Sequence, residues 1–375
     1  VYNRVKNQYV EELTDKELVE KALNGMLQAL DPHSSYMNEE VFKEMQEDTS
    51  GTFGGLGIEI TTDKGFIKII SPIDDTPADK AGIQAGDYIT PLNGDSVVDM
   101  NLKEAIDIMR GEVGTSIILT IIRGTEEPFD VELIRDTIKM ASVKHRVLND
   151  VGVLRVSTFN EQTTSGLKDS IQELEESENP PIGYVLDLRN NPGGLLTESV
   201  SVSDLFLEQG EIVSIRGREK KDVQVFSAKK GDLIYQKPLV VLINEGSASA
   251  SEIVAGALQD HDRAVIMGMK SFGKGSVQTI VPIDSGAIRL TIAKYYTPSG
   301  DSIQAVGIEP DVVVPRAELN IIDNYFTFRE SDYQDALDNE TTDGSEEEAT
   351  STDILEKDYQ LSRAVDAVKT IAVLN

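Results

Sequence analysis

The sequence predicts a multidomain α/β (α+β) chain, in which a helical N-terminal segment and a β-rich module precede a core of alternating strands and helices. Three observations support this prediction. Apolar residues recur at three- and four-residue spacings near the N-terminus, β-rich runs with turn signals follow, and apolar strands then alternate with helical patterns. Such alternation is typical of a largely parallel sheet covered by helices.

Composition narrows the possible partners and chemistry. A chain of 375 residues suggests two or three folding units. Its net charge of −30 argues against nucleic acid as a main partner, because phosphate binding needs a positive surface. The absence of cysteine excludes disulfides, thiolate nucleophiles and Cys-ligated metals. No apolar run is long enough for a transmembrane span.

The first segment, residues 1–50, is predicted to be helical. Its apolar residues follow a helical period around LTDKELVEKALNGMLQAL, and Asp31-Pro32 ends that pattern. We interpret this segment as a helical cap or a dimerisation arm.

The second segment, residues 52–137, is predicted to be a compact β-rich module. Two β-rich runs flank Asp63-Lys64-Gly65, which is a hairpin signal. NLKEAIDIMRG is predicted to be a helix whose Leu102, Ile106 and Met109 share one face. The runs TSIILTIIRG and FDVELIR close the module as strands.

The third segment, residues 138–318, contains the strand–helix alternation. IGYVLDLR and PLVVLIN are predicted to be buried strands, and each is followed by a turn and a helix. Residues 319–352 are predicted to form an acidic, solvated linker, because residues 330–348 contain nine Asp or Glu and no Lys or Arg. Residues 353–375 regain helical periodicity.

The sharpest local feature is LINEGSASASEIVAGALQD, in which a buried strand and a glycine-containing turn precede a helix. A serine at such a turn exposes its hydroxyl, and nearby backbone N–H groups can stabilise an oxyanion. The helix N-terminus adds partial positive charge there. The segment from Ser249 to Glu252 also fits a capping box, so these residues alone leave both a nucleophile and a helix cap open.

A serine nucleophile needs a base, and no pattern places any of the three histidines to serve. His261 lies on the same predicted helix as Ser249, roughly 18 Å away at about 1.5 Å per residue. His33 and His145 lie in segments that nothing in the sequence brings near the serine. A lysine is the alternative, because burial can lower its pKa enough to leave it neutral.

The segment SFGKGSVQ supplies that lysine. Lys274 stands between two glycines within an otherwise apolar stretch, which favours burial, although an ordinary surface lysine also fits. Gln278 lies four residues further, on the same side in a helix or a strand, and is placed to hold the amine by a hydrogen bond.

Two glycine-rich turns are candidate binding loops. DLRNNPGG, residues 187–194, follows a buried strand and can offer backbone N–H donors to a ligand, but it also fits a tight turn chosen for geometry. GGLGI, residues 54–58, opens the β-rich module. The N–H groups of such a loop can receive a terminal carboxylate while the adjacent strand edge pairs with an extended peptide.

In this order, the motifs resemble those of the carboxy-terminal processing proteases, also called tail-specific proteases. The resemblance covers roughly residues 20–318. It includes LDPHSSYM, the PDZ-type segment from GGLGI through SPIDDTPADKAGIQAGDYI to IMRG, DLRNNPGG, GSASASEIVAGALQD, GKGSVQ and YYTPSG…GIEPD. It implies a PDZ domain and a crotonase/Clp-protease-like α/β protease core with N- and C-terminal helical segments.

Residue by residue, the resemblance implies a catalytic site. Ser249 matches the nucleophile, Lys274 the general base and Gln278 the residue that orients this base. The backbone N–H of Ala250 and that of one glycine in the NPGG turn match the oxyanion hole. The sequence does not choose between Gly193 and Gly194 for that second donor.

The resemblance also implies residues that bind the substrate's C-terminal tail and a residue that links this binding to the catalytic site. The tail-binding residues are Gly55, Leu56, Gly57 and Ile58, with Arg110 as a link from the PDZ helix to the catalytic site.

The implied activity is a serine endopeptidase that cuts protein substrates near their free C-termini and needs no metal or other cofactor. The implied location is the periplasm or cell envelope, after removal of a signal peptide that this chain, which opens at Val1, does not contain. Helical segments at both ends predict a homodimer or a higher homo-oligomer.

Two residues depart from the family pattern. Pro91 stands where another strand residue is usual, and Asp301 stands where a basic residue is common, which puts local strand pairing and substrate charge preference in doubt. Two other functions fit parts of the sequence. One is a non-catalytic peptide-binding scaffold, and the other is a crotonase-like acyl-CoA enzyme, which would need neither a tail-binding module nor the Ser–Lys spacing.

Overall fold

The computed structural model describes residues 1–375 except 64, 93–94, 98–99, 319–354, 356 and 375. The chain divides into two units. One comprises Val1–Tyr36, Ser142–Phe159 and Thr163–Asn375, and the other comprises Met37–Ala141 and Asn160–Gln162. The predicted acidic linker, residues 319–352, lies wholly outside the described residues. The predicted domain boundaries stay predictions.

The N-terminal region is helical, as predicted. Its helices are α1 (Tyr2–Gln8), α2 (Asp15–Gln28) and α3 (Glu39–Ser50). Thr14 and Glu17 form a capping box at the start of α2. The Asn38 side chain caps α3, and Gly51, with a φ of 67°, ends it.

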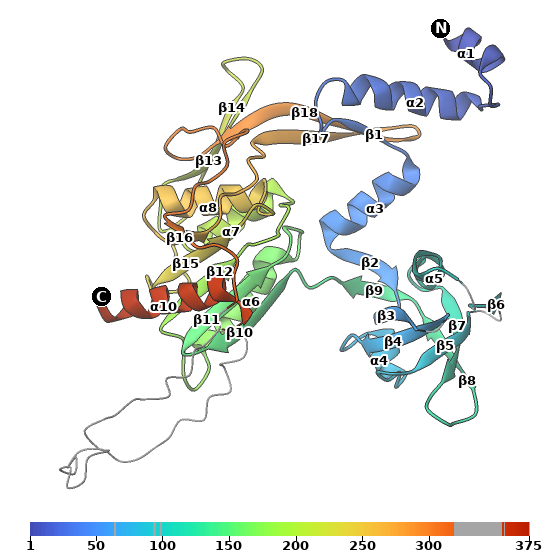
Figure 1. Ribbon diagram of the computed structural model, residues 1–375, viewed down its shortest axis with the longest axis horizontal. Coiled ribbons are helices and arrows are strands. Elements are labelled where there is room, and N and C mark those ends of the chain that lie inside the picture. The colour runs from blue at the N-terminus through green and yellow to red at the C-terminus, as the bar shows by residue number, and fades with distance from the viewer. Residues whose placement is uncertain (64, 93–94, 98–99, 319–354, 356, 375) are drawn as a thin grey trace. The chain divides into compact units, whose positions relative to one another are not determined.

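The unit that contains α3 is built around a six-stranded antiparallel sheet (Figure 1). Its strands follow the order β3-β4-β5-β7-β8, with β6 paired to β5, and a separate pair joins β2 to β9. The elements are β2 (Thr52–Gly55), β3 (Ile58–Asp63), β4 (Phe66–Pro72), α4 (Pro77–Lys80), β5 (Tyr88–Leu92), β6 (Asp95–Ser96), α5 (Leu102–Met109), β7 (Ser116–Ile122), β8 (Phe129–Ile134) and β9 (Asp136–Lys139).

Pro91 lies within β5, where its effect on strand pairing can be seen. It pairs with Ser96 of β6, while the register of β5 against β7 shifts between Ile89 and Leu92. Proline has no N–H to donate to a ladder, so an irregularity at this place is expected.

The second six-stranded sheet forms the centre of the other unit and has the order β10-β11-β12-β15-β16-β19. All neighbours from β11 to β19 are parallel, and only β10 is antiparallel. This confirms the predicted α/β core. The strands are β10 (Val143–Leu148), β11 (Val151–Val156), β12 (Gly183–Asp187), β15 (Leu239–Ile243), β16 (Val265–Gly268) and β19 (Val312–Val313).

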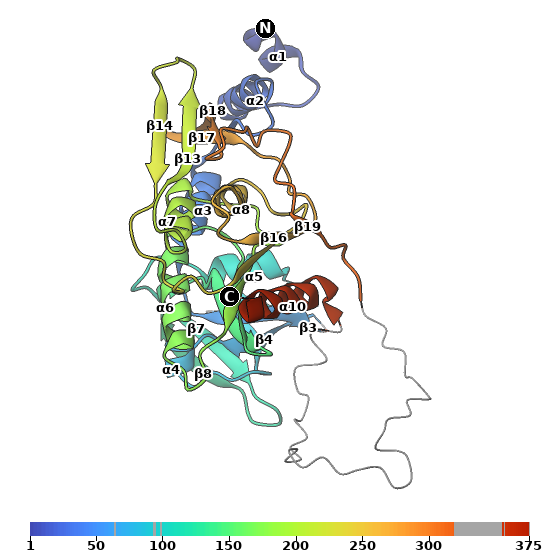
Figure 2. The same cartoon turned by 90° about the vertical axis from the view of Figure 1, so that its left-hand side faces the viewer.

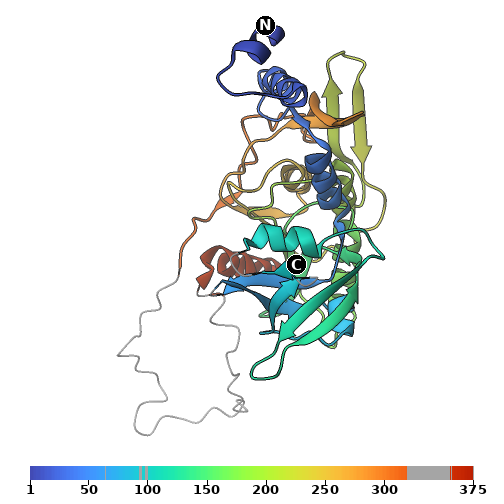
Figure 3. The same ribbon diagram turned by 90° about the vertical axis from the view of Figure 1, so that its right-hand side faces the viewer.

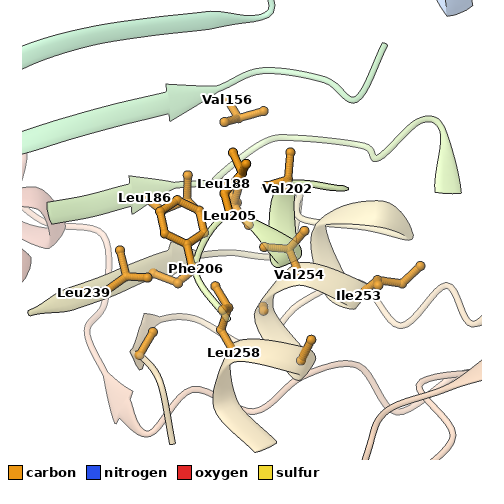
Figure 4. Close-up of a cluster of buried hydrophobic side chains, with 14 of the residues drawn as sticks. Val156, Leu186, Leu188, Val202, Leu205, Phe206, Leu239, Ile253, Val254 and Leu258 are labelled. Carbon is orange, nitrogen blue, oxygen red and sulfur yellow. The ribbon is translucent and has the colours of Figure 1, made fainter. Parts of the chain in front are cut away.

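Helices cover both faces of this sheet, which accounts for the fully buried strands β12 and β15. The helices α6 (Thr163–Glu175), α7 (Leu196–Asp204) and α8 (Ala250–Asp260) contribute to one hydrophobic core. Figure 4 shows side chains of this core, in which Leu186, Phe206 and Val254 gather between sheet and helices. The helix α10 (Tyr359–Leu374) packs on the opposite face.

A third sheet extends from the core and carries the segment after Lys274. It has the order β1-β18-β13-β14, with β17 paired to β18. The strands are β1 (Ser35–Met37), β13 (Glu211–Gly217), β14 (Val223–Ser227), β17 (Ser276–Ile283) and β18 (Gly286–Tyr296). The β13–β14 hairpin projects past α7 (Figure 2), and α2 lies near the β17–β18 hairpin (Figure 3). Among the described residues, no helix has the length and apolar character that crossing a bilayer would require.

Candidate active site

Ser249 sits where strand β15 turns into helix α8. Its φ is 56°, a left-handed conformation that costs a non-glycine residue of order 1–3 kcal/mol. The turn is held from outside, because Ser247 Oγ donates to the Leu188 carbonyl at 2.9 Å and the Ala248 N–H donates to the Asn191 carbonyl at 3.0 Å. This strained position places the serine at a helix N-terminus next to the turn after β12.

The carboxylate of Glu252 joins two separate loops beneath Ser249. Glu252 is fully buried, and its Oε2 accepts the Ser249 N–H at 2.7 Å and the Lys274 N–H at 2.9 Å. Its Oε1 accepts from Ser271 Oγ and from the Gly273 N–H, both at 2.6 Å. A buried carboxylate is stable only when such donors surround it, so both loops are fixed to the same group.

Lys274 is half-buried between two glycines that pack closely. A Cβ on Gly275 would meet the Gln304 backbone nitrogen at 2.4 Å, and Gly273 has a φ of 92°. Burial lowers the pKa of Lys274, the Arg289 guanidinium lowers it further, and Glu252 opposes both. Within the described residues, the lysine amine has no hydrogen bond or ion pair. The amine of Lys274 therefore loses its proton more readily than that of an exposed lysine.

The phenol of Tyr295 lies between the serine and the lysine. This side chain is 2% exposed, and its O–H donates to the Lys274 carbonyl oxygen. Burial raises the pKa of Tyr295, while an interaction with the Ser249 hydroxyl lowers it. One phenolic oxygen thus contacts both the side chain of Ser249 and the backbone of Lys274.

Gln278 lies on β17, on the strand that follows Lys274. Its Nε2 donates to Ser276 Oγ at 3.0 Å and to Thr291 Oγ1 at 3.1 Å. The predicted hydrogen bond between Gln278 and the lysine amine is not among the contacts of the described residues. The orienting role of Gln278 stays a prediction.

The turn after β12 lies directly against Ser249. A Cβ added to Gly193 would stand 2.8 Å from Ser249 Cβ and 3.0 Å from the Ala250 nitrogen. The Gly193 N–H donates to Asn191 Oδ1 at 2.9 Å, which leaves it unavailable to a substrate. Within the described parts of the chain, the N–H groups of Gly194 and Ala250 have no acceptor. This difference favours Gly194 over Gly193 as the second oxyanion donor.

Two of the three histidines are engaged elsewhere. His261 follows the last residue of α8, and its Nε2 contacts the Glu211 carbonyl oxygen at 2.7 Å. His145 Nδ1 contacts Ser170 Oγ at 3.1 Å.

His33 is placed differently from what the sequence suggested. Burial lowers its pKa, the positive charge of Lys274 lowers it further, and Asp31 opposes both. His33 therefore lies within electrostatic range of the lysine, although no sequence pattern brings the two together.

The predicted tail-binding loop lies in the other unit, between β2 and β3. Gly57 has a φ of 77°, and a Cβ there would meet Thr76 at 2.3 Å. Leu56 and Gly55 are buried, and Ile58 begins β3, an edge strand of its sheet. Among the described residues, the N–H groups of Leu56 and Gly57 have no acceptor.

Arg110, at the end of α5, makes contacts within the same unit as that loop. Its Nη1 donates to Glu47 Oε2 at 3.3 Å, and its guanidinium lies 4.3 Å from the centroid of the Phe53 ring. Its predicted role as a link to the catalytic site stays a prediction.

Three segments of the chain match known families. Residues 150–314 match Peptidase family S41, residues 68–123 match the PDZ domain, and residues 1–41 match the activating protease CtpB N-terminal domain.

Similar proteins carry consistent descriptions. The chain is 56% identical over 318 residues to a carboxy-terminal-processing protease of Bartonella bacilliformis, covering 84% of this chain and 73% of that protein. It is 39% identical over 321 residues to the carboxy-terminal processing protease CtpA of Bacillus subtilis, covering 85% of this chain and 68% of that protein. A solved structure, the photosystem II D1 C-terminal processing protease, is similar with a TM-score of 0.50 and 30% identity, covering 84% of this chain and 86% of that one.

The contact of Gly193 with Ser249 generates a prediction. We expect Gly193→Ala to lower peptidase activity at least about hundredfold, because the methyl group would displace the serine and the oxyanion donors. The control is Gly231→Ala, since Gly231 also has a positive φ, 140°, but nothing lies within 4 Å of its Cβ position. Equal activity of the two variants, measured on one protein substrate, would contradict this account of the turn.

Proposed function

Because this chain belongs to the carboxy-terminal processing proteases of peptidase family S41 and carries a PDZ domain, we propose that Ser249 and Lys274 form the catalytic dyad of its serine peptidase activity. The observation that supports this most is the buried Glu252, whose carboxylate accepts the backbone N–H of both residues. One group thereby fixes the serine loop and the lysine loop to each other.

The proposed chemistry is acyl transfer. The neutral amine of Lys274 takes the proton of the Ser249 hydroxyl as that oxygen attacks a peptide carbonyl carbon. Lys274 then gives this proton to the leaving amine as the C–N bond breaks. Water repeats the cycle, because Lys274 takes its proton while the hydroxide oxygen attacks the acyl-enzyme, and Ser249 leaves with that proton.

The oxyanion that forms during each attack needs donors already in place. We assign this role to the backbone N–H groups of Ala250 and Gly194. Ala250 is the first residue of α8, so the partial positive charge of the helix N-terminus adds to its donor strength. Such preorganised donors stabilise developing charge without reorganisation during the reaction.

Substrate selection is proposed to lie in the PDZ domain. The free N–H groups of Leu56 and Gly57 would receive the terminal carboxylate, and the edge strand β3 would pair with the last residues of the substrate. Arg110, through its ion pair with Glu47 of α3, would couple binding of the tail to the catalytic site. Cleavage near the substrate's free C-terminus follows from this mode of capture.

Assembly and location are part of the same proposal. Apolar side chains of α1, α2 and the segment between them are exposed, among them Tyr9, Val10 and Met26. Such side chains on an N-terminal arm suit contact with a second copy, so we propose a homodimer or a higher homo-oligomer. The family resemblance favours the periplasm or cell envelope as the place of action.

The direct test is digestion of an envelope protein extract by the parent and by Ser249→Ala, with new C-termini identified by mass spectrometry. We expect the parent alone to generate new C-termini, because the variant has no hydroxyl to attack a carbonyl. Degradation at the parent's rate by the variant would show that Ser249 is not the nucleophile. A parent without any cleavage would instead favour the peptide-binding scaffold.

The pH dependence of cleavage tests Lys274 as base. Because the lysine must be neutral, activity should rise with pH, and its lowered pKa places this rise below the range of an ordinary lysine. Arg289→Gln removes a positive charge that lowers the pKa of Lys274, so the rise should move to higher pH. The exposed Arg218→Gln is the control and should leave the profile in place. A profile unchanged by Arg289→Gln would argue against Lys274.

A further inference from the structure

The LDPHSSYM segment, residues 30–37, has no part in the proposed dyad, yet it is hydrogen-bonded to β18, the strand that pairs with Gln278 of β17. Asp31 Oδ1 accepts the His33 N–H at 2.8 Å, the Ser34 N–H at 3.0 Å and Thr291 Oγ1 at 3.1 Å. Asp31 Oδ2 accepts Ser34 Oγ at 2.6 Å. The Thr291 N–H in turn donates to Ser34 Oγ at 3.1 Å. Asp31 and Thr291 are 260 positions apart in the sequence.

The strand pairing brings Thr291 to Gln278. The two residues are direct partners between β17 and β18, just after the register shifts at Val277 and Gln278. Ile292 is the extra residue of this bulge, because Val277 pairs with Ala293. A bulge beside an active site redirects side chains. Here Gln278 Nε2 reaches both Ser276 Oγ and Thr291 Oγ1.

Asp31 determines which group donates in each hydrogen bond of the series Asp31–Thr291–Gln278. Burial raises the pKa of Asp31, but its hydrogen bonds outweigh this and hold the pKa below its usual range, so the carboxylate is ionised and only accepts. The single hydroxyl proton of Thr291 must therefore point at Asp31. The lone pairs of Thr291 Oγ1 then face Gln278, which must donate through Nε2.

The orientation of the Gln278 amide follows from this. Both protons of Nε2 are used, one on Ser276 and one on Thr291, so Nε2 cannot also face the lysine. Oε1 is left without a partner among the described residues. A lysine amine is a donor, and the oxygen is the only atom of this amide that can accept from it.

We infer that Asp31 and Thr291 are positioning residues of the catalytic site, which hold the Gln278 amide with its oxygen available to Lys274. This inference rests on the proposed dyad and assigns a role to the N-terminal LDPHSSYM segment. It makes the segment after helix α2 a part of the catalytic apparatus rather than only a helical cap or dimerisation arm.

Other groups act on the same lysine and must be held constant in a test. Arg289 of β18, Glu252 of α8 and His33 of the LDPHSSYM segment carry the charged or titratable groups that influence Lys274. Neither Thr291→Val nor Thr291→Ser alters any of them. A change in the pH profile of these variants therefore reports on the Gln278 amide.

The chain also offers a matched control for simple loosening of the hairpin. Tyr36, in the same LDPHSSYM segment, donates its O–H to the Ser285 carbonyl at 2.6 Å, at the turn between β17 and β18. Tyr36→Phe removes this anchor without touching Asp31, Thr291 or Gln278. If the segment only stabilised the hairpin, Tyr36→Phe and Thr291→Val would change kcat and the pH profile in the same way.

The experiment measures kcat, KM and the pH profile of the full chain on a peptide that spans one cleavage site found in the digest. Thr291→Val keeps the shape of threonine but cannot accept from Gln278, so kcat should fall roughly three- to tenfold with KM unchanged. Loss of the Gln278 acceptor disfavours the lysine ammonium, so the rise of activity should move to lower pH. Thr291→Ser should restore kcat and the pH profile, and Asp31→Ala should lower kcat as Thr291→Val does.

Thermal melting of each variant separates activity from stability. A parent-like kcat and pH profile in Thr291→Val, or the same loss in Tyr36→Phe, would overturn the inference and leave the dyad intact. Full activity in Ser249→Ala, measured in parallel, would instead overturn the proposed function itself. If Asp31→Ala does not fold, the comparison of Thr291→Val with Thr291→Ser still tests the inference.

Discussion

The structure of the proposed catalytic site depends on one buried carboxylate. Glu252 accepts hydrogen bonds from the loop of Ser249 and from the loop of Lys274, which are separated in sequence by a helix and a strand. Without it, the buried Ser271 hydroxyl and Gly273 N–H would lose their acceptor. Because Glu252 lies in the first turn of α8, its carboxylate fixes the positions of the helix start, Ser249 and Lys274 relative to one another.

Around this group, the serine side and the lysine side of the site are held in different ways. The fully buried strands β12 and β15 bring the NPGG turn and the serine turn side by side at the same edge of the sheet. The β17–β18 hairpin carries the lysine side of the site. It is held near Lys274 by the Tyr295 phenol and the Asp31 network, and at its turn by the Tyr36 hydroxyl. Local geometry on the serine side is therefore built into the core, while the lysine side depends on contacts from the N-terminal segment.

Local patterns allowed the sequence to predict the alternating core and the serine at a strand-to-helix turn, because buried parallel strands and helix starts are encoded by neighbouring residues. Contacts between distant segments could not be predicted this way. Glu252 has the sequence pattern of an ordinary helix-capping residue, and nothing local indicates that it also binds residues 271–274. The proximity of His33 to Lys274 and the pairing of Asp31 with Thr291 depend on strand register and a bulge, which no periodicity encodes.

We propose that Glu252 holds Ser249 and Lys274 in one catalytic arrangement. The most direct measurement is kcat of Glu252→Gln on a protein substrate, with circular dichroism as the check of folding. An amide cannot accept at both of its ends, so two N–H or O–H donors would face an NH₂ group. We expect Glu252→Gln to fold and to have a kcat at least about hundredfold lower than that of the parent. A folded Glu252→Gln with parent-like kcat would contradict it.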